Sequence, residues 1–251
     1  MTHDRTKKKI YFSIVIATKN SGKVLQNCLD SLKNQTYKFF EVIIIDAKSN
    51  DNTMSIIDSN SSDISFFSSE EDHGIYDAWN KALEVVKYDW IIFLGSDDIL
   101  FPQTLDIYCN YLRINNKLEF VSSKIRIFDY DSKKSRIYGS KYNWNILKKY
   151  MNIAHVGAIH NRKIFKKFGK FNTLFRVCGD YEFFLRTREN LNVGFIDEIT
   201  CCMKAGGASQ QFSSLKEAFQ VKKMHGVRIK VFLYLDYYVA IIKYFLRKLF
   251  K

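Results

Sequence analysis

The sequence predicts an α/β protein with a doubly wound, mostly parallel sheet flanked by helices, and an amphipathic helix at the C-terminal end. Short β-rich runs alternate with helical patterns over the first hundred residues, which is typical of strand–helix–strand units. Two of the runs, Val42–Ile45 and Ile91–Leu94, are apolar at every position. Such runs are expected where helices cover both faces of a parallel sheet. A chain of 251 residues with 47% hydrophobic content is long enough to bury one sizeable core.

The first half of the chain supplies four predicted strands and two predicted helices. The strands are the β-rich runs Tyr11–Ala17, Glu41–Asp46, Ile64–Phe67 and Trp90–Leu94. Apolar residues at helical spacing predict one helix from about Val24 to Leu32, after the capping candidates Asn20 and Ser21, and another over Ile75–Val86. Ligands of such a sheet bind beyond the carboxyl ends of its strands, so the residues that follow each run are the first candidates for a site.

The second half is less regular and is predicted to continue the same globule. Its expected strands are Phe120–Phe128, Arg136–Tyr138, Ala154–His160 and Val193–Ile196, and its expected helices are Arg162–Phe168 and Asp180–Arg188. Pro102 is expected near the start of a further helix. No internal repeat and no linker composition interrupts the chain. We therefore divide one globule into residues 1–100, residues 101–215 and a basic amphipathic tail, residues 216–251.

The net charge of +13 is unevenly distributed along the chain. Residues 11–100 are net acidic, whereas residues 101–215 and 216–251 are net basic. This asymmetry favours a metal or hydroxyl-rich ligand on one side of the molecule, and phosphates, anionic lipid or an acidic saccharide on the other. Solvated surface lysines are the alternative explanation of the same imbalance.

Cysteine content and the N-terminal residues bear on location. The five cysteines are odd in number and show no C-x-x-C or Cys/His spacing, which predicts neither a disulfide framework nor a zinc site. The charged residues of Met1–Lys9 are followed directly by the first predicted strand. The apolar stretch of a signal peptide or a spanning helix is not seen there. We therefore expect a reducing, cytoplasmic location.

Polar and acidic side chains follow all four predicted strands of the first half. Asp46 is a candidate hydrogen-bond acceptor for a base edge or a ribose, and Asp97 with Asp98 offers the hard oxygen ligands that Mg²⁺ or Mn²⁺ prefers. An isolated Asp at a strand end more commonly caps a helix, but acids at several ends of one sheet favour a ligand site. No glycine-rich phosphate loop follows the first strand, which argues against dinucleotide-binding and P-loop chemistry.

These residues, taken in order, resemble the successive motifs of family-2 glycosyltransferases with the GT-A fold. The matching segments are Phe12–Asn20, Ile45–Thr53, Asp72–Lys81, Phe93–Asp98, His155, Lys167–Phe171 and Gly179–Arg186. The resemblance implies an inverting glycosyltransferase of bacterial cell-surface polysaccharide assembly. Such an enzyme moves one sugar from a nucleoside-diphosphate donor, a UDP-sugar by preference, to a saccharide or a polyprenyl-diphosphate-linked acceptor. Residues 1–100 would then bind the donor, and residues 101–215 would bind the acceptor and carry the base.

The resemblance also implies roles for individual residues. Asp180 matches the catalytic base, and Asp97 stands at the metal-binding end of the D-x-D element with Asp98 beside it, where Mg²⁺ or Mn²⁺ would bind. The residues implied around the donor are Thr18, Asn20, Asp46, Asp51, Asp72, Gly74 and Asp97.

The sequence also departs from the family pattern. Gly95 replaces the first aspartate of D-x-D, which weakens the case for strict metal dependence, and Ala47 with Lys48 relaxes the expected base preference. No Q-x-x-R-W element follows Asp180, which argues against a processive synthase. Gly206–Ser209 resembles a flexible segment near the donor phosphates, although an ordinary glycine turn explains it equally well.

Side chains around the expected base have simpler alternatives. Asp180 is also a candidate N-cap of its helix, and Glu182 is expected to be a surface or pocket-wall acid. His155 and His160 are expected on opposite faces of one strand, which argues against a shared metal site and leaves His155 as a candidate for the acceptor site.

Two rival functions remain open at this point. A nucleotidyltransferase on a related sheet lacks support because the glycine-rich phosphate loop is missing. A non-catalytic binder of nucleic acid or of an anionic surface would use the basic charge, but the acidic strand ends would repel nucleic acid. We therefore expect no nucleic-acid partner.

The tail is expected to form a helix over about Val227 to Lys251 that lies on the anionic inner face of the cytoplasmic membrane. One arc of this helix holds Asp236, Ala240, Lys243, Arg247 and Lys251, and the opposite side holds Tyr238, Ile241, Ile242, Phe245 and Leu249. A terminal helix packed on its own core would show the same stripe.

Overall fold

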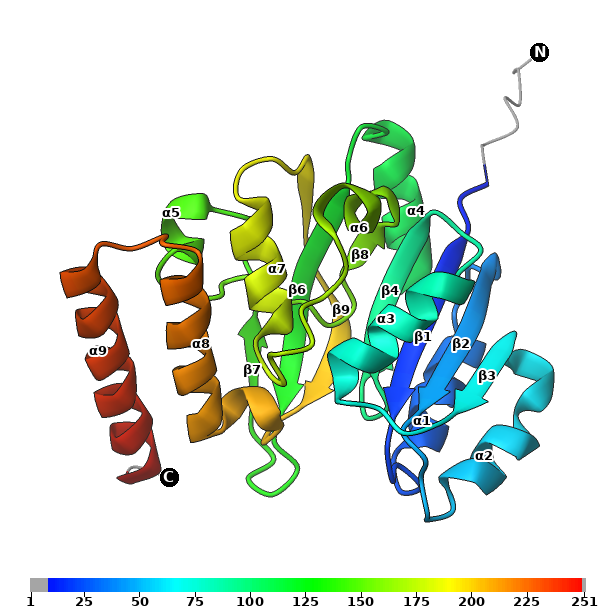
Figure 1. Ribbon diagram of the computed structural model, residues 1–251. Helices are drawn as coiled ribbons and strands as arrows, with labels where there is room; N and C mark the ends of the chain where they lie inside the picture. The colour runs from blue at the N-terminus through cyan, green and yellow to red at the C-terminus, as the bar shows by residue number, and fades with distance from the viewer. Residues whose placement is uncertain (1–8, 250–251) are drawn as a thin grey trace.

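The computed structural model describes residues 9–249 and shows a single curved sheet with helices on both faces (Figure 1). Within these residues nine strands form the sheet in the order β3-β2-β1-β4-β8-β6-β9-β5, and β7 pairs with the second half of β6. The α/β architecture predicted from the sequence is therefore confirmed.

The N-terminal half of the sheet is parallel. Its strands are β1 (Phe12–Thr18), β2 (Phe40–Asp46), β3 (Phe66–Ser69) and β4 (Trp90–Gly95). The connecting helices are α1 (Leu25–Lys33), α2 (Thr53–Ser59) and α3 (Ile75–Val85). Apolar side chains alternate between the two faces of β1, where Ile14 and Ile16 pack towards α1 and Val15 packs towards α3.

The second half of the sheet adds antiparallel strands to the parallel first half. Its strands are β5 (Ile99–Leu100), β6 (Phe120–Phe128), β7 (Ser135–Tyr138), β8 (Ile159–Asn161) and β9 (Val193–Lys204). β8 is antiparallel to both β4 and β6, and β5 is antiparallel to β9, whereas β6 and β9 are parallel. The inserted strand β8 thus joins the two halves into one sheet.

The remaining helices complete both layers. They are α4 (Thr104–Ile114), α5 (Trp144–Leu147), α6 (Lys163–Phe168), α7 (Gly179–Thr187), α8 (Phe212–Met224) and α9 (Lys230–Leu249). The apolar core on one face includes side chains of α1, α2 and α4, and the core on the other includes α3, α6, α7 and α8. Among the described residues, no helix has both the length and the apolar character that crossing a bilayer requires.

Two predicted strands differ most from the structure, and one long helix is additional. The expected strand Ala154–His160 shrinks to Ile159–Asn161 because Gly157, at φ 74°, turns the chain. The strand expected over Val193–Ile196 continues to Lys204, with register shifts opposite Ser123–Ile125 that keep it paired to β6. Helix α8 was not predicted.

Candidate functional site

Strand register brings the predicted donor residues to one edge of the sheet. Thr18 at the end of β1 is paired with Asp46 at the end of β2, and Asp46 is paired with Ser69 at the end of β3. On the other side of β1, Ala17 is paired with Gly95 at the end of β4. The loops that follow these strands therefore form one continuous rim.

Asp46 and Asn20 both bind the turn that follows β2. The fully buried Asp46 carboxylate accepts hydrogen bonds from Ser49 N at 2.9 Å, Ser49 Oγ at 2.5 Å and Ser69 Oγ at 2.7 Å. Asn20, at φ 49°, accepts from Asn50 N at 2.9 Å and donates its own N–H to Ser49 Oγ at 2.7 Å. In this conformation both side chains hold the rim together, and donor contact by Asp46 and Asn20 stays a prediction.

Asp51 and Asp72 likewise act on their own loops. Asp51 accepts from Gly22 N at 3.0 Å and from both the N–H and the hydroxyl of Thr53, and the Thr53 hydroxyl is the main reason why the pKa of Asp51 is lowered. Asp72 accepts from Gly74 N at 2.9 Å, and Gly74 begins α3 at φ 115°, a conformation that favours glycine. Their donor contacts also stay predictions.

Thr18 differs from these residues because its hydroxyl has no partner. The residue is 3% exposed, and Thr18 Oγ1 makes no hydrogen bond to any other described group. A buried hydroxyl without a partner is rare in folded proteins. Thr18 is thus the rim residue with unused hydrogen-bonding capacity beside the expected base and ribose site.

The two aspartates after β4 differ in exposure. Asp97 is exposed and makes no hydrogen bond to another described residue. Asp98 is 3% exposed, and its Oδ2 accepts from Gly95 N at 2.7 Å. Burial, together with the charge of Asp97, raises the pKa of Asp98 to about 8. Asp97 Oδ1 and Asp98 Oδ2 each lie 3.1 Å from the position that a Cβ on Gly95 would take, so the two carboxylates lie on the same side of Gly95, and their joint role as metal ligands stays a prediction.

Asp180 lies half-buried in the first turn of α7, in contact with Tyr76 of α3. Its Oδ1 accepts hydrogen bonds from Tyr76 Oη at 3.0 Å and from Tyr181 N at 2.8 Å. No other described residue bonds to Oδ2. One oxygen is thus fixed while the other remains available to a substrate. The sequence did not predict the contact between Tyr76 and Asp180. Its one signal was that Tyr76 lies in the family-like segment Asp72–Lys81.

The histidine prediction is wrong in its geometry. The rings of His155 and His160 lie 4.8 Å apart, because the strand that would have separated them does not form. Both are buried, and burial lowers the pKa of each. Nε2 of His155 and both ring nitrogens of His160 lack hydrogen-bond partners. Even so, no group of three or more His, Cys, Asp or Glu side chains in the described part of the chain is arranged to hold a metal ion.

Glu182 is a buried acid, so the expected surface position is wrong. The residue is 2% exposed and contacts Arg186 at 3.1 Å and His225 Nε2 at 2.8 Å. Burial of a carboxylate is tolerated where such partners compensate for lost water. Glu182 therefore joins α7 to the end of α8.

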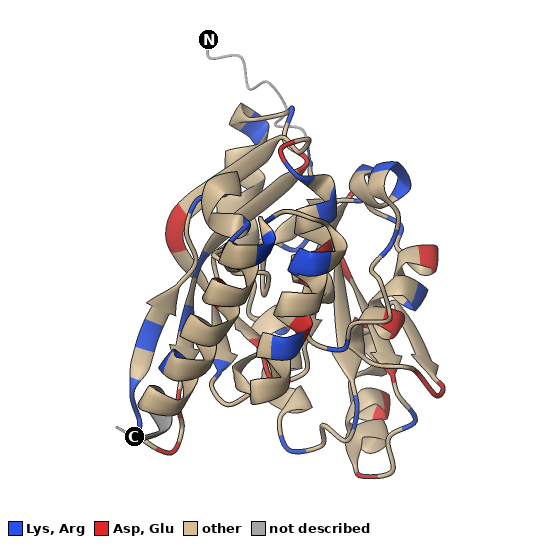
Figure 2. Ribbon diagram, turned by 60° about the vertical axis from the view of Figure 1, so that its left-hand side comes forward, with Lys and Arg blue, Asp and Glu red and all other residues tan. Residues whose placement is uncertain are grey.

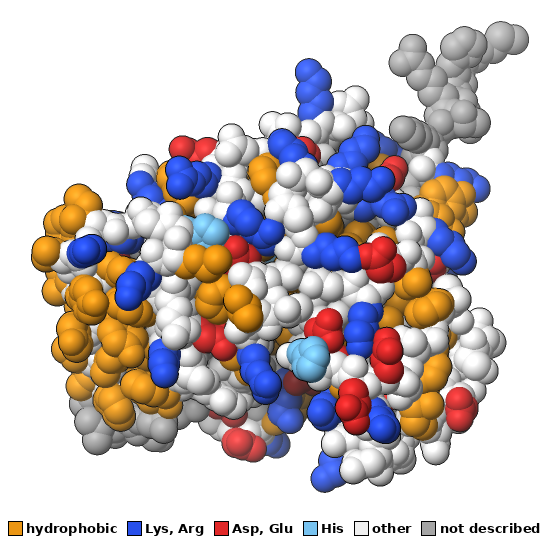
Figure 3. Space-filling view, in the orientation of Figure 1, with side chains coloured by type: hydrophobic (Ala, Val, Ile, Leu, Met, Phe, Trp, Pro, Cys, Tyr) orange, Lys and Arg blue, Asp and Glu red, His pale blue; other side chains and the backbone are white. Residues whose placement is uncertain are grey.

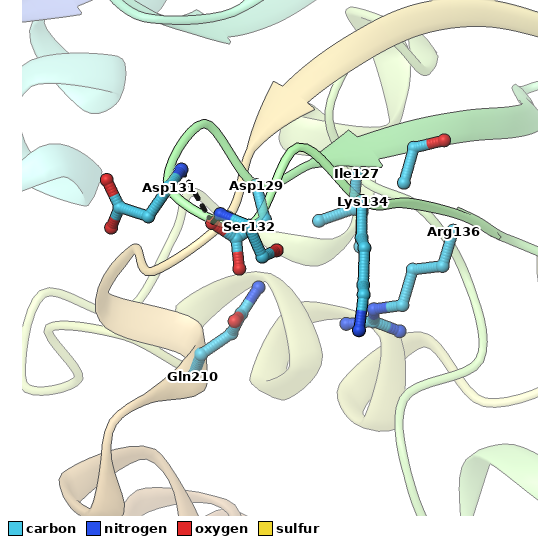
Figure 4. Close-up of a pocket in the computed structure, with 9 residues that line it drawn as sticks. Ile127, Asp129, Asp131, Ser132, Lys134, Arg136 and Gln210 are labelled. Carbon is cyan, nitrogen blue, oxygen red and sulfur yellow. Dashed lines mark hydrogen bonds between the residues drawn. The ribbon is translucent and has the colours of Figure 1, made fainter. Parts of the chain in front are cut away.

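A pocket opens beside the β6–β7 hairpin (Figure 4). Its volume is about 570 Å³, and its lining includes Lys134, Arg136, Ser132, Asp129 and Gln210. Lys134 and Arg136 extend in the same direction, as alternate residues of an extended chain do (Figure 4). Because β6 runs parallel to β4 within the sheet, the hairpin lies at the same edge as the rim.

Helices α8 and α9 pack side by side at one end of the molecule (Figure 1). Phe219 of α8 packs on Tyr237 with ring centroids 4.8 Å apart, and Leu233 is buried. The other side of α9 is exposed and largely apolar, as Figure 3 shows. Its exposed apolar residues are Val231, Phe232, Tyr234, Leu235, Tyr238, Val239, Ile242, Phe245 and Leu246, which we call the apolar face of α9.

The expected polar arc of this helix is only partly described. Lys243 is exposed, but Asp236 turns to Arg228 in an ion pair of 2.9 Å. The side chain of Arg247 and residue Lys251 lie outside the described parts of the structure. One side of α9 thus packs on the protein and the apolar side does not, so contact of the apolar side with a membrane stays a prediction.

Comparisons with known proteins agree with the fold and the motifs. The sequence profile described as "Glycosyl transferase family 2" matches residues 13–178. The PGL/p-HBAD biosynthesis glycosyltransferase of Mycobacterium tuberculosis (strain ATCC 25177 / H37Ra) is 29% identical over 183 residues, covering 71% of this chain and 70% of the relative. The poly(ribitol-phosphate) beta-N-acetylglucosaminyltransferase TarP of Staphylococcus aureus (strain N315) is 34% identical over 109 residues, covering 41% of this chain and 33% of TarP.

Solved structures show the same fold. Residues 1–349 of S. aureus TarS, in complex with UDP-GlcNAc, match with a TM-score of 0.72 at 18% identity, covering 87% of this chain and 66% of that chain. The mannosyltransferase PcManGT of Pyrobaculum calidifontis, in complex with GDP-Man and Mn²⁺, matches with a TM-score of 0.61 at 16% identity, covering 87% and 63%. This chain spans 39% of a longer TarS structure. The fold is therefore similar to that of GT-A glycosyltransferases, and because the family profile matches well over half of its residues, the chain belongs to glycosyl transferase family 2.

Proposed function

We propose that this glycosyltransferase moves one sugar, with inversion, from a nucleoside-diphosphate donor to a saccharide or polyprenyl-diphosphate-linked acceptor in cell-surface polysaccharide assembly. The observation that carries the proposal is the half-buried Asp180 carboxylate, in which the described residues engage Oδ1 and make no bond to Oδ2. A UDP-sugar is the favoured donor, since TarS binds UDP-GlcNAc on the same fold. Residues 1–100 would bind the donor, and residues 101–215 the acceptor.

The reaction needs a base on the acceptor and charge stabilisation on the leaving group. Asp180 Oδ2 takes the proton of the acceptor hydroxyl while that oxygen attacks the anomeric carbon. The bond from the anomeric carbon to the diphosphate breaks as the new glycosidic bond forms, and the nucleoside diphosphate leaves from the opposite side. The unpartnered Thr18 hydroxyl supplies a hydrogen bond to the base or ribose of the donor.

The residues at the end of β4 fit a divalent cation that binds together with the donor. Mg²⁺ in phosphate sites takes one or two protein carboxylates and fills its other positions with phosphate and water oxygens. Asp97 is exposed and unpaired among the described residues, so it would hold Mg²⁺ or Mn²⁺. The ion, when bound, neutralises the charge that develops on the diphosphate. The Mn²⁺ in the PcManGT complex supports this assignment.

Donor turnover tests the proposed reaction directly. Purified protein is incubated with a panel of sugar nucleotides, and the phosphate products are measured. Release of nucleoside diphosphate from one donor is the expected result. Release of pyrophosphate would instead indicate a nucleotidyltransferase. Salt-sensitive binding of nucleic acid without any turnover would indicate a non-catalytic binder. The spread of Lys and Arg over many elements, interspersed with Asp and Glu, does not favour that last outcome (Figure 2).

The hairpin pocket is the proposed place for an anionic part of the acceptor. The double variant Lys134→Gln, Arg136→Gln is expected to raise the acceptor KM about tenfold at low salt with donor KM unchanged, because two exposed cations are lost. Initial rates at varied acceptor concentration measure this. Lys133→Gln is the matched control, since Lys133 lies in the same hairpin but does not line the pocket. An equal rise in the control would show only a general effect of charge.

The apolar face of α9 is proposed to lie on an anionic membrane surface, on the cytoplasmic side, where a lipid-linked acceptor would be found. Contiguous exposed apolar surface of this extent is unusual for a protein that meets only water. The net basic charge of residues 216–251, with Lys223, Lys230 and Lys243 exposed, is complementary to anionic lipid.

Co-sedimentation with vesicles that contain anionic lipid tests this surface. The double variant Leu235→Gln, Ile242→Gln is expected to weaken vesicle binding by roughly tenfold or more, because two side chains 54% and 58% exposed lose their transfer into the interface. Ile114→Gln on α4, 84% exposed, is the matched control and is expected to bind like the wild type. Unchanged vesicle binding by the double variant would contradict the proposal. So would wild-type self-association that the double variant abolishes, because a second copy would then cover the face.

A further inference from the structure

The turn before α7 is capped from a distant helix. The backbone N–H groups of Arg176, Val177 and Cys178 all donate to the carboxylate of Glu217, at 3.1, 2.8 and 2.9 Å. Cys178, the N-cap residue of α7, makes no capping hydrogen bond with its own side chain. Glu217 lies on α8, 39–41 residues further along the chain. It therefore supplies the acceptor for three successive N–H groups that lead into α7.

The same turn is held from its other side by α3. Tyr76 Oη lies 2.8 Å from the carbonyl oxygen of Val177 and 3.0 Å from Asp180 Oδ1. Gly179 lets the ring approach the backbone, because a Cβ there would come within 2.7 Å of the Tyr76 ring. The turn at residues 176–178 is thus held from both α3 and α8, and Asp180 itself is held from α3.

We propose that Glu217 is a positioning residue for the catalytic base, which makes α8 part of the catalytic apparatus. The proposal rests on the proposed role of Asp180. Among the described residues, the Glu217 carboxylate bonds to the turn at residues 176–178 alone, and it acts by fixing where α7 begins. The family profile ends at residue 178, so this contribution comes from a helix outside the matched segment.

A carboxylate suits this position better than any other side chain. Two ionised oxygens offer about four acceptor sites, enough for three N–H donors, whereas an amide has a single oxygen and places an NH₂ group against the remaining donor. Glu217→Gln therefore keeps the size of the side chain and leaves at least one N–H of the turn without its partner. A displacement of the base by about 1 Å is enough to lower a rate by about 10²-fold.

Steady-state kinetics of sugar transfer test the proposal. Glu217→Gln is expected to lower kcat by about 10–10²-fold and to leave the donor KM within about twofold. Glu198→Gln is the matched control, since Glu198 is exposed on β9 and makes no hydrogen bond or ion pair with another described residue. Adding Glu217→Gln to Asp180→Asn is expected to lower kcat no further than Asp180→Asn alone, because Glu217 acts through Asp180. Tyr76→Phe, which removes only the hydroxyl, is expected to show the same split between kcat and KM.

The possible results distinguish a failure of the role proposed for Glu217 from a failure of the role proposed for Asp180. Wild-type kcat in Glu217→Gln, or a further loss of the full size in the double variant, overturns the positioning role. If Glu217→Gln fails to fold, Tyr76→Phe decides, and an unchanged kcat there overturns the idea that this turn is fixed for catalysis. If Asp180→Asn alone transfers sugar at the wild-type rate, the assignment of the base fails instead.

Discussion

Asp180→Asn is expected to lower kcat for sugar transfer by about 10²–10⁴-fold while the donor KM stays nearly constant. The amide oxygen can still accept from Tyr76 Oη and Tyr181 N, so the side chain keeps its place. What it loses is the ability to take a proton from the acceptor. Transfer rates at saturating acceptor, with donor binding measured separately, distinguish this chemical loss from a binding defect.

Two further variants make the result specific. Asp89→Asn is the matched control, because Asp89 is exposed at the beginning of β4, at the opposite edge of the sheet. It is expected to behave like the wild type. A large loss in Glu182→Gln with Asp180→Asn near the wild type would reassign the base. The structure argues against that outcome, since Glu182 is buried against Arg186 and His225.

Asp97→Ala is expected to lower kcat/KM by about 10²–10³-fold and to abolish nucleotide binding that depends on a divalent cation. The fold should be retained, because the side chain is exposed and unpaired among the described residues. Calorimetric titration with a nucleoside diphosphate, with Mg²⁺ or Mn²⁺ and again with a chelator, measures the binding. Wild-type turnover in the presence of chelator would contradict a role for the metal, and Gly95 in place of a first aspartate makes this comparison necessary.

The neighbouring aspartate provides the contrast. Asp98→Asn is expected to bind the nucleotide like the wild type, because Asp98 is only 3% exposed and an amide oxygen can still accept from Gly95 N. Loss of binding equal to that of Asp97→Ala would show that both carboxylates hold the ion.

Buried strands of the first half could be predicted from the sequence almost to their ends. β4 was expected at Trp90–Leu94 and runs over Trp90–Gly95, because a strand covered on both faces is marked along its whole length by apolar residues. β8 could not be predicted in the same way. Three residues carry no usable periodicity, and their partners lie on β4 and β6, far away in the sequence.

The candidate site was predictable as a set of residue types, but the direction of each side chain was not. Acids at strand ends locate the rim, yet Asp97 is exposed whereas its neighbour Asp98 is buried. That difference arises from a turn that closes on Gly95 N. The contact between Tyr76 and Asp180 joins residues 104 positions apart, so no local pattern signals it.

The late position of β8 in the chain also constrains how the protein folds. β4 is complete at residue 95, but its free edge is paired only by residues 159–161, and β5 is paired only by β9. While the chain is being synthesised, the apolar strand β4 therefore has one unpaired edge until more than sixty further residues have been added. Open edges of this kind recruit other chains, and pairings between distant segments form slowly. Folding of the N-terminal half is thus completed only after the second half has been made, and chaperone binding in that interval would protect the exposed strand.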